Sequence, residues 1–259
     1  MTPGPTAAPE PGKRRRPVAI MVGGGLVLAA LGAAMIGHSQ GWGEDTAPPP
    51  AAAPSSEPEH GPDGAGNGKP APAAPREQGE PDWNGLTRMD VHGAQLPVSP
   101  VHGPKNATEQ AASGFTRDIG GAALAAVHLA TRVSPQVGPK VYVPNAERMK
   151  GDRTAFLAQV DADYAKARDA SGLPEGEPLR IHAQVIGYAA PAAASSAEQV
   201  TVHLLSRGAG PDGGEVLVSV PVTLTWSDGD WALRTPPGGK WPGQSVTGTA
   251  GYTLFPGED

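Results

Sequence analysis

The clearest structural signal in this chain is the stretch EVLVSVPVTLTWSDGDWALRT, residues 215–235. Apolar and polar residues alternate along its first half, as in a strand that buries one face. Asp228 and Gly229 then supply the positive-φ positions of a tight turn, and residues 230–235 return as a second strand. The stretch therefore predicts an antiparallel hairpin whose two tryptophans, Trp226 and Trp231, belong to the core.

Two earlier segments alternate in the same way and predict further strands. They are LRIHAQVIGY (179–188) and QVTVHLLS (199–206), separated by turn-forming Gly, Pro and Ser residues. With the hairpin, they predict an antiparallel sheet of about four strands. Pro221 has no N–H to donate to the ladder, so we expect an edge position or a bulge there.

Two helices are predicted before the strands. Residues 120–133 have helical periodicity, with Thr116 as a candidate N-cap and Pro135 as the stop. A second helix is predicted from 152 to 170, because apolar residues recur there at spacings of three and four and Gly172 follows. The expected apolar stripe of the first helix consists of Ala122, Ala126, Leu129 and Val133.

The order of helices followed by strands predicts an α+β fold for residues 82–259. In this arrangement the two helices cover one face of a curved antiparallel sheet. The segment LPVSPVHGP (96–104) contains too many prolines for a helix or a central strand. We expect it to be an extended lead-in over the domain surface.

Residues 38–81 differ in composition from the rest of the chain. They are rich in Pro, Ala and Gly, and they contain almost no aliphatic side chain larger than alanine. Such a segment buries too little apolar surface to offset the entropy cost of ordering it. We therefore predict a disordered linker between the domain and the part of the chain before it.

The N-terminal part of the chain predicts a single membrane crossing. Residues 18–37 carry no charge, and twenty residues of helix span about 30 Å, the thickness of the hydrocarbon core of a bilayer. The tail of residues 1–17 holds a basic cluster, so the positive-inside rule places it in the cytoplasm and the later domain outside. A cleaved export signal remains the alternative. The predicted membrane-anchoring residues are Lys13, Arg14, Arg15 and Arg16.

Charge and cysteine content exclude several classes of function. Residues 1–37 carry four basic groups and one acidic group, a charge of +3, so the rest of this chain of net charge −6 carries −9. An acidic exterior disfavours direct nucleic acid binding, whereas the basic tail suits anionic lipid. The chain has no cysteine, which excludes disulfides, cysteine nucleophiles and thiolate metal sites.

No catalytic motif occurs in the sequence. It lacks a G-x-S-x-G elbow, a phosphate-binding G-x-x-x-x-G-K-[ST] loop and an H-E-x-x-H zinc motif. The phase of the strands places apolar residues on the face toward the helices, with no general base among them. His182 and His203 are candidate cross-strand neighbours for a weak metal site or a pH sensor, but two polar residues on a solvated sheet face are the more usual interpretation. His128 is expected on the first helix beside its apolar stripe, as a boundary residue between the buried and the solvated face. We predict no catalytic residue, no cofactor and no metal.

The Gly- and Pro-rich C-terminal tail contains two large aromatic residues, Trp241 and Phe255. Exposed aromatic side chains are frequent anchors in protein interfaces. We therefore name these two as candidate partner contacts.

The hairpin WSDGDWAL (226–233), behind two helices, resembles the cone-shaped fold of the nuclear transport factor 2 superfamily. Behind a single span and a Pro-rich linker, it is similar to the scaffold subunits of type IV secretion and Gram-positive conjugation systems. A further resemblance is to uncharacterised actinobacterial membrane proteins associated with integrative and conjugative elements. It rests on residues 96–104, GFTRDIGGAALAAVHLATRV (114–133) and GPKVYVPN (138–145). Arg117-Asp118 departs from the Thr-Pro pair that is more usual there.

These resemblances imply a non-enzymatic, single-pass protein of the cell membrane whose extracellular domain makes protein contacts. It would be a scaffold or accessory subunit of a conjugation or secretion apparatus, with the membrane, envelope proteins or its own copies as partners. The alternative is a membrane-tethered domain of the cone fold that binds a small molecule or acts as an enzyme. The sequence identifies no small-molecule substrate.

Overall fold

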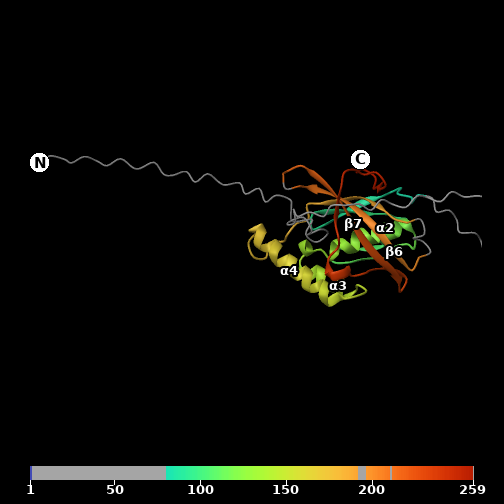
Figure 1. The fold of residues 1–259 in the computed structure, drawn as a ribbon, viewed down its shortest axis with the longest axis horizontal. Helices are drawn as coiled ribbons and strands as arrows, with labels where there is room; N and C mark the ends of the chain where they lie inside the picture. Colours follow the sequence, from blue (N-terminus) through green and yellow to red (C-terminus); the bar gives the residue numbers. More distant parts are fainter. Residues whose placement is uncertain (2–79, 192–196, 211, 259) are drawn as a thin grey trace, which may run out of the picture.

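The structure is a computed structural model that describes residues 80–191, 197–210 and 212–258, together with Met1 (Figure 1). It confirms an α+β fold with a large antiparallel sheet and helices packed on it. In chain order the described elements are β1 (Thr87–Val91), β2 (Ala94–Val98), β3 (Asn106–Ala107), β4 (Ala112–Ser113), α2 (Ile119–Arg132), η2 (Pro135–Val137), α3 (Pro139–Glu147), α4 (Arg153–Ser171), β5 (Gln184–Ala189), β6 (Gln199–Ala209), β7 (Glu215–Ser227), β8 (Asp230–Leu233), η4 (Pro237–Gly239), β9 (Gln244–Val246) and β10 (Thr253–Leu254).

The main sheet has the strand order β10-β5-β6-β7-β8, and β9 pairs with β7 on the same edge as β8. The four predicted strands are therefore all present and adjacent in one sheet. The predicted hairpin is confirmed, because Trp226 lies opposite Trp231 and the turn residues Asp228 and Gly229 have φ of 56° and 83°. The sheet is larger than predicted because β9 and β10 are too short to show a periodic pattern.

Pro221 lies in the interior of β7, opposite His203 of β6. The predicted bulge is wrong, because the register between β6 and β7 runs without a shift from Gln199 to Ala209. On its other side β7 pairs with β9 at residues 217–219 and with β8 at 224–227. Residue 221 falls between these two short partners, so the missing N–H of proline costs no ladder hydrogen bond there.

The one register shift in the main sheet occurs in β5, between Val185 and Gly187. Before it, Leu179, Ile181 and Ala183 are buried, as the alternation predicts. Beyond it the buried residues become Ile186 and Tyr188. A bulge adds one residue to the strand and therefore changes which face the later side chains occupy.

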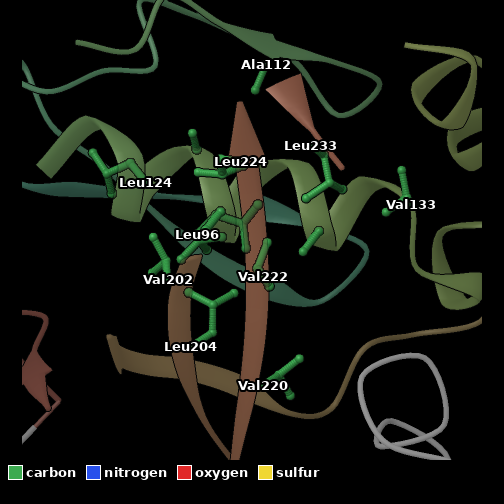
Figure 2. Close-up of a cluster of buried hydrophobic side chains, with 14 of the residues drawn as sticks. Leu96, Ala112, Leu124, Val133, Val202, Leu204, Val220, Val222, Leu224 and Leu233 are labelled. Atoms are coloured by element: carbon green, nitrogen blue, oxygen red, sulfur yellow. The ribbon is translucent and has the colours of Figure 1, made fainter. Parts of the chain in front are cut away.

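Helix α2 is enclosed on almost all sides, rather than along one stripe as predicted. Its residues from Gly120 to His128 are all buried, and the helix packs against β6, β7 and β8. Figure 2 shows Leu124 of this helix with Val202, Val222 and Leu224 of the sheet in one apolar cluster. Small alanine side chains allow this close approach.

The N-cap of α2 is Asp118, and the candidate Thr116 does not fill this position. The Asp118 side chain accepts a hydrogen bond from the Gly121 N–H at 2.7 Å. Thr116 contributes differently, since its backbone carbonyl oxygen would lie 2.0 Å from any Cβ at position 121. A glycine is therefore required at the first turn of the helix.

The second predicted helix is confirmed as α4, which begins after the N-cap Asp152 and ends at Gly172 in the left-handed conformation. Between α2 and α4 lies α3, a helix that the sequence reasoning did not predict. α3 begins at Pro139, a position that tolerates proline, but it contains Pro144 in its interior, where proline disfavours a helix. In Figure 1, α3 and α4 lie together on the side of the domain opposite the C-terminal end.

The predicted surface lead-in at residues 96–104 is wrong. Residues 94–98 form β2, which pairs with β1 in a hairpin that also packs against α2. Leu96, Ser99 and His102 are buried, with exposed fractions of 2%, 2% and 7%. The prolines exclude this segment from the main sheet, but they do not exclude it from the core.

The predicted tail (1–17), span (18–37) and linker (38–81) lie outside the described residues, apart from Met1 and the last two linker positions. Within the described ranges, the structure contains no helix that is both long enough and apolar enough to cross a bilayer.

Candidate functional site

A cleft of about 730 Å³ lies beside the free edge of β8. Its apolar lining comes from β4, α2 and its C-cap, the α3–α4 connection and β8, and Figure 2 labels three of these side chains, Ala112, Val133 and Leu233. Its polar lining comes from the α3–α4 connection and the β7–β8 turn. The apolar set is Ala112, Leu129, Val133, Met149, Trp231, Ala232 and Leu233, and the charged set is Glu147, Arg148, Lys150, Arg153, Asp228 and Asp230.

The backbone of β8 leaves two hydrogen-bonding groups toward this cleft. The Arg234 N–H donates to the Thr223 carbonyl oxygen at 2.9 Å, so residue 234 faces β7. Backbone N–H and carbonyl groups of successive residues in a strand point to alternate sides. Those of Trp231 and Leu233 therefore point away from β7, toward the free edge. The structure gives no partner to the Leu233 N–H or to the Trp231 carbonyl oxygen among the described residues.

The other two edge groups of these residues are already bonded. The Trp231 N–H donates to Asp230 Oδ1 at 2.9 Å, and the Leu233 carbonyl oxygen accepts from the Lys150 N–H at 2.9 Å. The Lys150 carbonyl oxygen then accepts from the Thr235 N–H at 2.8 Å, which makes Lys150 a one-residue parallel neighbour of Arg234. The edge of β8 is therefore covered at its C-terminal end and open before it.

The cationic groups of the cleft have few competing partners. Arg148 is exposed, and its side chain makes no hydrogen bond or ion pair in the described structure. Arg153 donates from Nη1 to the Glu147 carbonyl oxygen at 2.7 Å. Lys150 Nζ lies 3.8 Å from Asp228 Oδ2, an exposed contact that contributes little stability. These cations are available to an anionic group of a ligand.

The carboxylate of Asp230, in contrast, is fully engaged. Its Oδ2 accepts from the Gly114 N–H at 2.7 Å, and its Oδ1 accepts from the N–H groups of Phe115 and Trp231 at 3.2 and 2.9 Å. The indole Nε1 of Trp231 donates to the Thr116 carbonyl oxygen at 2.9 Å. Asp230 and Trp231 therefore fasten the cleft wall to the segment that precedes α2.

A second cluster of polar residues lies between residues 96–104 and α2, and we call it the α2 interlock. His102 Nδ1 lies 3.1 Å from Asp118 Oδ1, and the ring covers Gly120, where a Cβ would be 2.5 Å from His102 Cγ. The other ring nitrogen, Nε2, is buried and has no partner among the described residues. Trp83 packs edge-on against this ring at a centroid distance of 5.2 Å.

The α2 interlock continues at His128, which is fully buried and not the boundary residue that was predicted. Its Nε2 donates to the Pro97 carbonyl oxygen at 2.8 Å, and its Nδ1 accepts from Arg132 Nη1 at 3.0 Å. Burial first, and the adjacent Arg132 charge, lower the pKa of His128 to about 3 against the opposing bond to Pro97. His128 is therefore neutral at physiological pH.

Arg132 is also fully buried, and no carboxylate pairs with it among the described residues. Its guanidinium donates to the backbone carbonyl oxygens of His128, at 3.0 Å, and of Thr108. Burial lowers the pKa of Arg132 to about 10, which leaves it charged at neutral pH. Arg132 therefore connects the end of α2 to the β3–β4 loop, and both of its side-chain NH₂ groups serve the fold.

The other predicted site residues lie apart from the cleft. His203 is exposed and lies opposite Ala189, whereas His182 is exposed and precedes β5, so the two are not neighbours. Trp241 and Phe255 are buried, with exposed fractions of 4% and 0%, so their prediction as exposed partner contacts is wrong. Trp241 packs on Phe156 of α4, and Phe255 packs on Tyr188. Lys13 to Arg16 lie outside the described residues.

The sequence reasoning missed Arg148, Lys150 and Arg153. Three basic residues within RMKGDR (148–153) gave a weak signal, because a short run of charge is usual at a solvated helix end. Their relation to β8 is a long-range contact that no local pattern contains. No group of three or more His, Cys, Asp or Glu suited to a metal ion occurs in the described part of the chain.

The cleft and the α2 interlock both lie within a recognised family segment. A family model described as a domain of unknown function, DUF8175, matches residues 45–254. The chain belongs to this family. The DUF8175 match ends at the last residue of β10, so it contains every strand of the main sheet. No curated protein and no solved structure matches the chain.

Proposed function

We propose that this protein is a non-enzymatic, single-pass protein of the cell membrane whose extracellular domain makes protein contacts through the cleft beside β8. The predicted span 18–37 and the basic residues Lys13 to Arg16 would anchor it with the N-terminus in the cytoplasm. Its role would be that of a scaffold or accessory subunit of a conjugation or secretion apparatus.

The open edge of β8 is the observation that carries this proposal. Natural proteins usually cover or charge such an edge, because its unpaired backbone groups attract another chain. Among the described residues, the Leu233 N–H and the Trp231 carbonyl oxygen have no partner, and they line a cleft that also carries the unpaired Arg148 side chain. Backbone groups of this kind suit a polypeptide ligand better than a small metabolite.

Complementation of a deletion strain tests the proposal. The strain would receive the full chain, the chain without residues 1–37, or the full chain with Arg148→Ser, and transfer of a resident conjugative element would be counted. We expect the full chain to restore transfer, the untethered chain to fail because it loses its effective concentration at the membrane, and Arg148→Ser to be impaired. Lys166→Ser, on exposed α4, is the matched control. Full activity of the untethered chain would contradict the proposal.

We also propose that the domain is related to the cone fold of the nuclear transport factor 2 superfamily. The hairpin of β7 and β8 and the packing of α2 on one face of the sheet support this relation. An experimental structure of the protein, superimposed on members of that superfamily with matched strand order, would test it.

One observation favours the alternative of an enzyme or small-molecule-binding domain. His102 is bonded to Asp118 through Nδ1, and its buried Nε2 has no partner among the described residues, which is the pairing used by histidine general bases. Hydrolysis of p-nitrophenyl acetate by the full chain, lost in His102→Gln with the fold retained, would favour it. Equal rates for the two proteins would leave the pair a structural role.

A further inference from the structure

The unbonded backbone groups at the free edge of β8 determine whether an added strand can pair in the antiparallel or the parallel direction. An antiparallel neighbour would need the N–H and the carbonyl oxygen of one and the same residue. At Trp231 the N–H is taken by Asp230, and at Leu233 the carbonyl oxygen is taken by Lys150. Neither residue therefore has both groups available.

A parallel neighbour uses a different pair of groups. Its residue opposite Ala232 would donate its N–H to the Trp231 carbonyl oxygen and accept from the Leu233 N–H. These are the two edge groups without a partner in the described structure. The same pattern already occurs one step along the edge, where Lys150 bonds to Leu233 and Thr235.

We propose that the cleft binds the C-terminal end of a partner protein as a short parallel strand on β8. This proposal rests on the proposed function of the cleft as a protein contact site. A parallel strand runs toward Lys150, which occupies the place opposite Arg234, two residues beyond Ala232. The added strand therefore has to end within one residue of Ala232, and a chain terminus is the simplest peptide that does so.

The charges of the cleft agree with this direction. Arg148 and Arg153 flank Lys150 in the chain, at the end where the carboxylate of the partner would lie. Asp228 and Asp230 lie at the opposite end of the cleft, at the turn before β8 and at its first residue. Glu147 lies at the basic end and reduces the net positive charge there. The terminal carboxylate would accept hydrogen bonds from the Leu233 N–H and from the free guanidinium of Arg148.

The C-terminal segment of this chain is not the occupant within the same molecule. Residues 253–254 form β10, which pairs with β5, and Phe255 is fully buried. Glu258 forms ion pairs with Arg88 at 2.8 Å and with Arg207 at 2.9 Å. Residues 253–258 are therefore held elsewhere, and the occupant of the cleft comes from another protein chain.

Peptides that differ only at their C-terminus test the proposal. The detergent-solubilised full chain would select binders from random octapeptides displayed with free C-termini. The best binder would then be compared with its C-terminal amide and with a version extended by Gly-Gly. We expect both changes to weaken binding at least about tenfold, because each removes or displaces a charge-assisted hydrogen bond. Binding should also slow amide hydrogen exchange at Leu233.

Variants place the peptide in the cleft. Arg148→Ser should weaken binding of the free-acid peptide several-fold and leave that of the amide nearly unchanged, whereas Lys166→Ser should alter neither. Equal binding of the acid, amide and extended peptides would overturn the proposed recognition of a terminal carboxylate. Unchanged amide hydrogen exchange at Leu233 would overturn the proposed strand addition. Failure to select any peptide would also overturn this inference. The complementation experiment with Arg148→Ser tests the proposed function of the cleft as a contact site independently of these peptide measurements.

Discussion

The α2 interlock and the cleft beside β8 differ in whether their polar groups are buried and bonded within the chain. In the interlock, His128 and Arg132 are fully buried, and both ring nitrogens of the histidine are bonded within the chain. At the cleft, Arg148 is exposed, and two backbone groups of β8 have no partner in the described structure. The comparison teaches that two residues with strongly shifted pKa values, His128 and Arg132, stabilise the fold. The groups that are still able to bind a ligand lie instead at the edge of β8.

The same contrast helps to interpret the resemblance to conjugation-associated membrane proteins, because it shows in which region the resembling segments lie. Two of the segments that carry it, 96–104 and 114–133, pack against each other in the interlock through His102, Gly120 and His128. The third, 138–145, forms most of α3. These segments contribute only Leu129, Val133 and Asn145 to the cleft lining and none of its charged residues, so they indicate a shared fold more directly than a shared ligand.

Trp231→Ala should have the largest effect, because this residue lines the cleft and also connects it to the segment that precedes α2. Its ring is 4% exposed, packs edge-on against Trp226 at 5.1 Å and donates to the Thr116 carbonyl oxygen. We expect a loss of about 3–5 kcal/mol in the free energy of unfolding, measured by urea titration of the full chain in detergent. Trp231→Phe should cost less. A loss below about 1 kcal/mol would show that the cleft wall is independent of the core.

His128→Gln should remove a pH dependence that belongs to the interlock. The pKa of His128 is about 3 in the folded chain and 6.5 when unfolded, so acid protonates the unfolded state first. Stability from this group is present above pH 6.5 and is lost as pH falls toward 3, by about 2 kcal/mol between pH 7 and pH 5. Unfolding at both pH values measures it, with His203→Gln as the exposed control. Equal pH slopes in the two variants would refute the assignment.

Much of the fold was predictable because its signals are local. Alternation and the Asp228-Gly229 turn predicted β7 and β8, and helical spacing with the stop at Gly172 predicted α4. The errors occur where tertiary packing overrides a local rule. The prolines of 96–104 argue for the surface, yet the burial of β2 under α2 is decided by residues more than twenty positions away.

The candidate site was much less predictable than the fold. Its key groups are backbone atoms of Trp231 and Leu233, which carry no side-chain motif, and Lys150 reaches them from a segment about eighty residues earlier in the chain. Trp241 and Phe255 illustrate the reverse error, since a Gly- and Pro-rich tail suggested exposure while aromatic packing buries both. Only the three-dimensional arrangement distinguishes a buried aromatic anchor from an exposed one.

Gly120→Ala should have an intermediate effect and tests the interlock alone. The added Cβ would lie 2.5 Å from His102 Cγ, so the ring or the helix has to move. We expect a loss of about 1–3 kcal/mol in the free energy of unfolding. Adding His102→Ala should make the effect of Gly120→Ala smaller, because the clashing ring is gone. Gly248→Ala, which meets nothing within 4 Å, is the control. Independent, additive effects would mean that the ring does not rest on the helix.

Arg148→Ser should have the smallest effect on stability, and this sharpens the contrast between the two regions. The Arg148 side chain is exposed and makes no hydrogen bond or ion pair in the described structure. Its loss should therefore change the free energy of unfolding by less than about 0.5 kcal/mol, close to the effect of Lys166→Ser. A loss above about 1 kcal/mol would mean that the arginine supports the fold, and the cleft would then resemble the interlock. With stability unchanged, any loss of peptide binding in Arg148→Ser reflects a lost contact with the ligand, because the folded population is the same in both proteins.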